Sequence, residues 1–411
     1  MSIVKYRKIS VEKICIYIFA FLIIYESGTV YSLVSIKQEP YSKLLLLFLA
    51  TYFTFKSLKT VNRYLELFLW LIILGAYCII NFVNYSDTTG VLIYRSYIFL
   101  VAFFSLNYFK SRSINFCNYI CKVIIFLAYT SLIIYFLARI INFPLPYSIF
   151  QLRGESNIDY YNFGGLYFDT GYANNMFGLT VYRMTGPFWE PGVFQIFLNY
   201  ALFMLFKNEK INKCNVLIII IDLLLTFSAA GWITACILFV YRFYKNKKND
   251  IKSKVILGIP ILIVGVATIL NVLFLKFDES FINGKNGSST YIRVNDLLLS
   301  LRLFKENIVF GTGYFNTEPF VKNNIFNSTV TKGCSNGFLT ICFTMGIVGI
   351  IFVCLPFILN IYKSEKKHKK DEIVNATLIL IFNFCEPIYY LPFMLMILAL
   401  EYHKMFIRQK I

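Results

Sequence analysis

One short run of the chain places an arginine and a glutamate where they could act on a phosphate ester and a hydroxyl group. The run is Arg183-Met-Thr-Gly-Pro-Phe-Trp-Glu-Pro-Gly192. Proline fits the first position of a helix, where its missing N–H costs nothing, so Glu190 is predicted to lie at the positive end of a helix dipole. A turn at Gly186–Pro187 would bring Arg183 back toward it. The run therefore predicts either a catalytic pair or a structural helix cap with an ion pair.

A second run with two arginines follows the capping pair Ser288–Ser289. Apolar residues recur there at helical spacing, which predicts an amphipathic helix lying in the membrane interface. Arg293 and Arg302 are nine residues apart, so they lie on opposite faces and at most one reaches a shared site. Either could instead reach lipid headgroups. Gly311-Thr-Gly313 is a weak signal for phosphate binding, because no strand or lysine accompanies it.

Three charged residues, Arg95, Arg139 and Asp222, fall inside apolar stretches or near their ends. Ionisable groups within a membrane are costly, which makes them functional candidates by default. The two arginines could instead reach the headgroups, and Asp222 requires an interior partner that the sequence does not identify.

The sequence does not point to a metal or another cofactor. Both histidines, His368 and His403, fall in basic segments, and the ten cysteines are scattered along the chain. Cys117 and Cys121 share one helical face, but two thiols without a third ligand are more typical of core packing than of a metal site. We therefore expect neither a metal nor a cofactor.

Membrane helices are the elements that must position these residues. Of the 411 residues, 58% are apolar and 15% are charged, whereas soluble proteins have about 25% charged residues. The apolar residues form blocks, and a helix of about 20 such residues crosses a bilayer. The blocks predict an all-α polytopic integral membrane protein with one transmembrane domain over residues 1–411. About twelve helices are expected, near residues 14–34, 44–55, 65–83, 93–109, 119–142, 190–206, 215–228, 231–244, 255–275, 336–361, 373–385 and 388–402.

The basic residues indicate the orientation of these helices. The net charge is +18, and most Lys and Arg residues fall in short clusters between apolar blocks. Basic short loops mark the cytoplasmic side of a membrane, and here every second loop is basic. The charge is therefore a topology signal and not evidence for nucleic acid, and both termini are expected in the cytoplasm. The clusters are residues 5–13, 56–63, 110–122, 207–213, 242–254, 363–370 and 404–410.

Two connections are far longer than the others, and both are expected outside the cytoplasm. They cover residues 143–189 and 276–335. Loops beyond about 15 residues are uncommon unless they are functional or disordered. The first is rich in aromatic residues, which disordered segments lack, so we expect it to fold against the membrane surface. The second contains the predicted interfacial helix.

Four motifs, in this order, make the chain resemble the O-antigen polymerase (Wzy) family within the O-antigen polymerase/ligase superfamily. The resemblance covers roughly residues 120–400. Two positions depart from the pattern: Ala229 stands where relatives often have arginine, and Ser335 where O-antigen ligases usually have histidine. The motifs are the run from Arg183 to Pro191, Thr226-Phe-Ser-Ala-Ala-Gly231, Arg293 with Gly311-Thr-Gly313, and Ser335-Asn-Gly-Phe-Leu339 leading into Gly346-Ile-Val-Gly349.

This resemblance implies a metal-independent glycosyltransferase at the outer face of the cytoplasmic (inner) membrane. A growing O-antigen or capsule glycan on undecaprenyl pyrophosphate would be transferred to a lipid-linked repeat unit. Arginine suits the pyrophosphate because its planar fork stays charged, and a carboxylate could take the proton of the acceptor hydroxyl. The residues implied are Glu190, Arg183 and Arg293 for catalysis and Arg95, Arg302, Ser335, Asn336 and Trp189 for substrate binding.

Two other functions remain possible from the sequence, an O-antigen ligase-like transferase and a flippase for the same lipid-linked oligosaccharide. Asp222 would suit a carrier, and so would short helices around the tight turns predicted at Ala229–Gly231 and Glu386–Pro387. Against it, the polar residues concentrate in the two long connections. The expected partners are the undecaprenyl-pyrophosphate-linked oligosaccharide, membrane lipid, a chain-length regulator and a separate flippase, and not nucleic acid.

Overall fold

The computed structural model describes residues 10–33, 41–58, 101, 104–151, 157–169, 171, 173–176, 179–208, 211–245, 289–313, 316–324 and 333–407. Within these ranges the chain is mostly helical, as expected. The predicted helices at 65–83 and 255–275, and most of the one at 93–109, lie outside the described residues. The number of twelve helices therefore stays a prediction.

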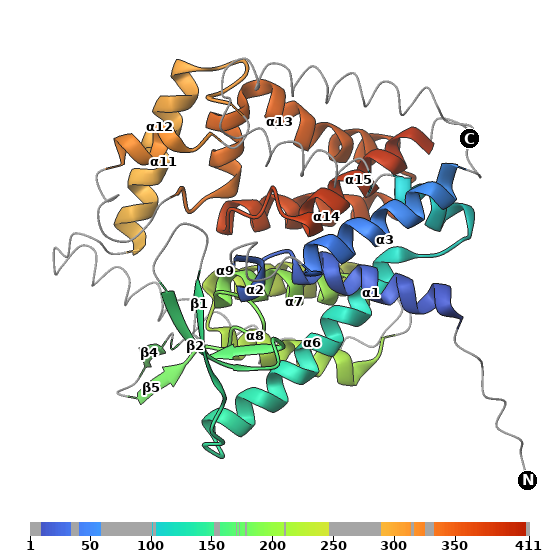
Figure 1. The fold of residues 1–411 in the computed structure, drawn as a ribbon. Helices are drawn as coiled ribbons and strands as arrows, with labels where there is room; N and C mark the ends of the chain where they lie inside the picture. The colour runs from blue at the N-terminus through green and yellow to red at the C-terminus, as the bar shows by residue number, and fades with distance from the viewer. Residues whose placement is uncertain are drawn as a thin grey trace, which may run out of the picture.

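The helices pack into a bundle, and the strands lie at one end of it (Figure 1). α11 and α12 lie at that same end, on the left of the view, whereas the start of α1 and the end of α15 lie at the other. The helices are α1 (Val11–Tyr25), α2 (Val30–Leu33), α3 (Tyr41–Leu58), α6 (Phe116–Arg139), α7 (Pro191–Lys207), α8 (Lys213–Thr226), α9 (Ala229–Lys245), α11 (Ser289–Glu306), α12 (Glu318–Asn323), α13 (Gly337–Lys363), α14 (Lys366–Cys385) and α15 (Pro392–Ile407).

α7 lies at the centre of the packing because its sequence is apolar on nearly every side. All side chains from Val193 to Phe206 are buried, and the helix packs against α6, α8, α9 and α14. One buried polar side chain joins it to α9: the Asn199 amide donates to the carbonyl oxygen of Gly231 at 3.1 Å. The turn before α9 lies at Phe227, with φ 47°, slightly earlier than the predicted turn at Ala229–Gly231.

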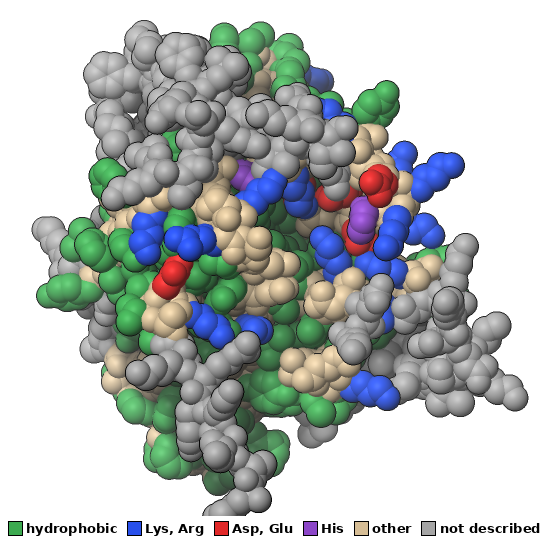
Figure 2. Space-filling model, turned by 90° about the vertical axis from the view of Figure 1, so that its right-hand side faces the viewer, with side chains coloured by type: hydrophobic (Ala, Val, Ile, Leu, Met, Phe, Trp, Pro, Cys, Tyr) green, Lys and Arg blue, Asp and Glu red, His purple; other side chains and the backbone are tan. Residues whose placement is uncertain are grey.

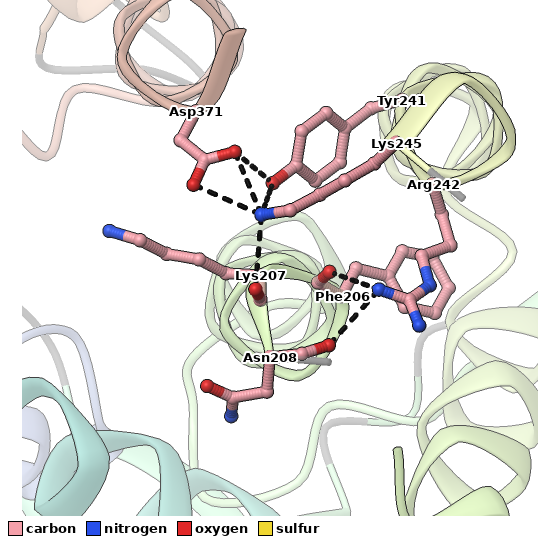
Figure 3. Close-up of polar contacts among 7 residues, drawn as sticks. All are labelled: Phe206, Lys207, Asn208, Tyr241, Arg242, Lys245 and Asp371. Atoms are coloured by element: carbon pink, nitrogen blue, oxygen red, sulfur yellow. Dashed lines mark hydrogen bonds and ion pairs between the residues drawn. The ribbon is translucent and has the colours of Figure 1, made fainter. Parts of the chain in front are cut away.

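Basic side chains of α9 close the C-terminal end of α7 (Figure 3). Arg242 donates to the carbonyl oxygens of Phe206 and Asn208, at 2.9 and 3.0 Å, and Lys245 donates to that of Lys207 at 3.0 Å. These carbonyl groups have no partner within α7, and cations there also complement its dipole. The basic cluster at the end of α9 thus fixes the ends of two helices relative to each other.

The expectation of an all-α chain is wrong in the first long connection. β1 (Tyr147–Gln151), β2 (Asn157–Phe163) and β3 (Tyr167–Asp169) form an antiparallel sheet, and β4 (Ala173–Met176) pairs with β5 (Leu179–Tyr182). Strand pairing supplies the hydrogen bonds that backbone groups require outside a helix. The aromatic residues that indicate a folded loop here also favour strands.

α13 is broken at Gly346, where φ is 62°. Residues 308–313 bond the backbone groups that the break leaves without helical partners. A Cβ at Gly346 would overlap the carbonyl oxygen of Val309, and one at Gly311 would overlap the backbone of Thr344. The three N–H groups of Gly311-Thr-Gly313 all donate to carbonyl groups of the chain itself, two of them in α13, which gives this segment a structural role. The amide-to-carbonyl bonds join Thr312 to Phe343, Gly313 to Thr344, Ile347 to Ile308 and Val348 to Val309, at 2.8 to 3.2 Å.

Several features support a membrane location. Among the described helices, α6 and α13 are long and apolar enough to cross a bilayer. α11 exposes Val294, Leu298 and Leu301, whereas it buries Asp296 and Ser300. A helix that exposes apolar residues beside exposed arginines suits a position in the membrane interface.

Candidate active site

Two glutamates from distant parts of the chain meet beside the first turn of α7. Glu190 precedes this helix in an extended conformation, and its side chain makes no capping bond to it. Its carboxylate instead accepts a hydrogen bond of 3.1 Å from Nε1 of Trp189. Glu386 ends α14, and its buried carboxyl group is hydrogen-bonded to Glu190. Pro191 begins α7 as predicted, but Glu190 does not cap it.

Two glycines make this meeting possible. A Cβ at Gly192 would overlap Oε1 of Glu386 and would lie 3.8 Å from the carboxyl carbon of Glu190. A Cβ at Gly337 would lie 2.7 Å from the carbonyl oxygen of Glu386. The first turns of α7 and α13 therefore both approach the end of α14. Because helix N-termini carry partial positive charge, this place favours negatively charged groups.

The pKa of Glu386 lies well above its ordinary value of 4.5. Burial is the main cause, and the charge of Glu190 and the hydrogen bond between the two carboxyl groups raise this pKa further. Arg293 and Arg183 lower it by smaller amounts. Burial has the largest effect because the two cations replace only part of the hydration that a charged carboxylate loses. Glu386 therefore keeps its proton to a higher pH than an ordinary glutamate, and in the protonated form it donates to Glu190.

Arg183 and Arg293 approach the glutamates from two further elements. Arg183 follows β5, and its Nε donates to the carbonyl oxygen of Thr226, at the end of α8, at 2.9 Å. Arg293 lies near the start of α11 with an exposed side chain. Both guanidinium groups are close enough to favour the charged form of Glu386. Four residues selected from the sequence thus lie around the same pair of carboxyl groups. They are Arg183, Trp189, Glu190 and Arg293.

Three other residues selected from the sequence have different surroundings. Arg302 is exposed on α11 and pairs with Glu306 at 3.2 Å. Ser335 donates to Oδ2 of Asp296 from both its N–H and its hydroxyl group, at 2.9 and 2.7 Å. Asn336 caps the first turn of α13 through its side-chain oxygen. These contacts give the last two residues a positioning role between α11 and α13.

The charged residues that the sequence places in or near apolar stretches do not belong to this group of side chains. Arg139, in the last turn of α6, forms an ion pair with Asp169 of β3 and lies over the ring of Tyr182. It thereby ties the strands to α6. Asp222 is fully buried in α8, and within the described residues neither of its oxygens has a hydrogen-bond partner. Arg95 lies outside the described residues.

Glu386 is the member of this group that the sequence reasoning missed. The sequence predicts a tight turn at Glu386–Pro387 but assigns no chemical role to the glutamate. The dipeptide Glu-Pro occurs four times, at 39–40, 190–191, 318–319 and 386–387, so it does not single out Glu386 in the sequence. Only the packing of α14 beside α7 brings this residue to Glu190.

The protonated state of Glu386 predicts a pH dependence of stability. The folded state keeps this proton above pH 4.5, where the unfolded chain releases it, so the free energy of unfolding should fall as pH rises. The expected slope is about 1.4 kcal/mol per pH unit until the raised pKa is passed. Glu386→Gln keeps a neutral donor to Glu190, and we expect it to lack this component of the slope.

Thermal unfolding of the purified protein between pH 5 and 8 measures the difference between wild type and variant. Glu365→Gln, at an exposed position before α14, serves as the control and should follow the wild type. Parallel pH curves for the wild type and Glu386→Gln would contradict the shared proton.

One comparison with known proteins gives a match. Residues 214–354, or 141 of the 411 residues, match the sequence model of the O-antigen ligase family. The matched segment contains Arg293, Ser335 and Asn336, whereas Glu190 and Glu386 lie on either side of it. No curated protein matches the chain. The match supports a place for the chain in the O-antigen polymerase/ligase superfamily, without distinguishing a polymerase from a ligase.

Proposed function

We propose that the chain is a polysaccharide polymerase that transfers a growing glycan from undecaprenyl pyrophosphate to a lipid-linked repeat unit. The family match supports a membrane glycosyltransferase of the O-antigen ligase or polymerase type, acting on lipid-linked oligosaccharides. The observation that carries the narrower proposal is the meeting of Glu190 and Glu386 with Arg183 and Arg293. Two carboxylates and two guanidinium groups match a reaction that needs a base and a clamp for pyrophosphate.

In the proposed step, the acceptor hydroxyl oxygen forms a bond to C1 of the donor sugar while the bond from C1 to the pyrophosphate oxygen breaks. The hydroxyl proton passes to Glu190, and the pyrophosphate leaves on its lipid. Arg293 and Arg183 stabilise the charge of the leaving group, because a guanidinium fork binds phosphate oxygens in pairs. The indole ring of Trp189, which is only half-buried, offers a surface for a sugar ring.

Glu386 acts as a positioning residue in this proposal. Its protonated carboxyl group holds Glu190 on one side, and the indole N–H of Trp189 holds it on the other. The two donors together fix the direction of the carboxylate. The proposed gain lies in orientation, since general bases act only within hydrogen-bond reach of the proton that they accept.

We assign the site to the outer face of the cytoplasmic membrane, with residues 143–189 and 276–335 on that side. The support is the position of the basic clusters, which gather at the other ends of α7 and α14 and mark the cytoplasmic side. Ser335 supports polymerase over ligase activity, because a serine anchored twice to Asp296 replaces the histidine that ligases usually carry.

Reconstitution of the purified chain in liposomes with a lipid-linked repeat unit tests the proposed function. A polymerase should produce a ladder of longer glycans that stay attached to the lipid pyrophosphate. Transfer to a different acceptor lipid would indicate a ligase instead. Movement of unchanged repeat unit across the bilayer would indicate a carrier.

A further inference from the structure

A cavity of about 760 Å³ lies at the end of the bundle opposite Glu190 and Glu386. It is bordered by the start of α6, the ends of α7 and α9, the start of α14 and the end of α15. α7 and α14 therefore carry the candidate active site at one end and this cavity at the other. α7 has 17 residues, and at about 1.5 Å per residue it is about as long as the hydrocarbon core is thick. The cavity consequently lies at the level of lipid headgroups.

The cavity collects one lysine from each of five basic clusters that are separate in the sequence. Figure 2 shows basic side chains gathered around acidic and histidine side chains on the face that contains it. A topology signal requires only that lysines lie on the cytoplasmic side, and does not require that they border one cavity. The five lysines are Lys110, Lys207, Lys245, Lys367 and Lys404.

Three carboxylates in the lining are already bound by two of these lysines. Lys245 contacts both oxygens of Asp371, at 2.9 and 3.0 Å (Figure 3). Lys404 pairs with Glu372, at 3.3 Å, and with Glu401. These acids are therefore occupied, and Lys207 and Lys367 leave the cavity with positive charge.

Lys207 and Lys367 supply part of that remaining charge. Neither has an acidic partner within the described residues. The Lys207 ammonium group extends away from the contacts that its own carbonyl group makes with Lys245 (Figure 3). The start of α6 adds partial positive charge, because Asn115 makes no side-chain cap to it and both Asn115 and Cys117 border the cavity.

Part of the lining is apolar. The half-buried side chains of Ile114 and Leu400 contribute to it. A small soluble phosphate compound would leave this apolar part uncovered. An anionic phospholipid fits both parts, because its phosphate can face the lysines while its acyl chains cover the apolar side chains. Basic pockets between membrane helices on the cytoplasmic side bind such headgroups in other proteins.

We propose that this cavity binds the phosphate headgroup of an anionic membrane lipid, with Lys207 and Lys367 as the main contacts. The proposal is independent of the glycosyl transfer proposed above. It predicts that the purified full chain retains phosphatidylglycerol in native mass spectrometry more strongly than phosphatidylcholine of the same acyl chains. Removal of each of the two lysine charges should weaken this retention about fivefold.

The test compares two double variants that remove the same charge from the same two basic clusters. Lys207→Gln with Lys367→Gln alters the cavity, whereas Lys213→Gln with Lys363→Gln alters exposed positions outside it. We expect the first pair to lose selective retention of phosphatidylglycerol and the second pair to keep it. Equal loss of retention in both double variants would show that the effect comes from general surface charge, and it would contradict the proposed site.

Inorganic phosphate separates a lipid site from a site for soluble phosphate compounds. Phosphate at millimolar concentration should leave the retained phosphatidylglycerol in place, because the acyl chains contribute to binding. Displacement of the lipid by phosphate alone would overturn the assignment to a lipid. Thermal unfolding of the wild type and both double variants checks that the variants are folded, so that loss of retention can be assigned to the cavity.

Discussion

Glu190→Gln is expected to stop polymer growth at a single lipid-linked repeat while leaving the amount of folded protein in the membrane near that of the wild type. The amide keeps an oxygen for the indole N–H of Trp189 but cannot take a proton from the acceptor. Loss of a general base typically lowers a rate by about 10²- to 10⁴-fold. Arg183→Ala should have a comparable effect through the leaving group. Gel analysis of the glycans made by reconstituted protein measures both.

The double variant distinguishes a catalytic pair from a structural one. If Arg183 and Glu190 act in one step, the double variant should be no more active than either single variant. If they only stabilise the fold, each single variant should reduce folded protein, and the double variant should partly restore it. Normal polymer from Glu190→Gln would transfer the role of base to another acid. Glu386 is then the candidate, because Asp169 is held in an ion pair with Arg139.

Arg293→Lys is expected to abolish most polymer formation even though the charge is kept. Lysine is a point charge, and it does not replace the planar fork that binds two phosphate oxygens at once. The side chain is exposed, so the substitution should leave the fold intact. The expected loss of initial rate is at least tenfold under saturating lipid-linked substrate, with an equal abundance of protein in the membrane.

Arg302→Lys is the matched control, because it makes the same change on the same helix. The Arg302 side chain is 75% exposed and pairs with Glu306 across one turn of α11, away from the glutamates. A surface pair of this kind contributes at most about 1 kcal/mol to stability. Because loss of this pair would cost little stability, the control should change the rate by less than about twofold. Equal loss in both variants would remove the distinction between the two arginines.

The sequence predicts the helical elements well because their signals are local. Pro191 begins α7, and the apolar blocks that fall within the described ranges become helices. The spacing of Val294, Leu298 and Leu301 gives the exposed apolar face of α11. The strands of the first connection are not predicted because aromatic residues are equally typical of a loop folded against the membrane surface and of a β-sheet. Pairing of β1 with β2 is decided by backbone bonds between segments, which periodicity does not show.

The site is predicted in part for the same reason. Arg183 and Glu190 belong to one run, so their proximity to the helix N-terminus follows from a turn between them. Glu386 reaches Glu190 only through the packing of α14 beside α7, and it requires the space left by Gly192. A residue whose neighbours come from another helix has no local signature except its own type, which here is an acid before a proline.

The break at Gly346 has a consequence for the biogenesis of the protein. A helix enters lipid at low cost only when its own backbone bonds are complete, and α13 lacks several of them around the break. The missing partners are in residues 308–313, which the ribosome makes before α13. The earlier segment must therefore be in place when α13 integrates, so that the two enter their final positions as one unit. A substitution at Gly311 would then reduce the yield of inserted protein before it affected any reaction.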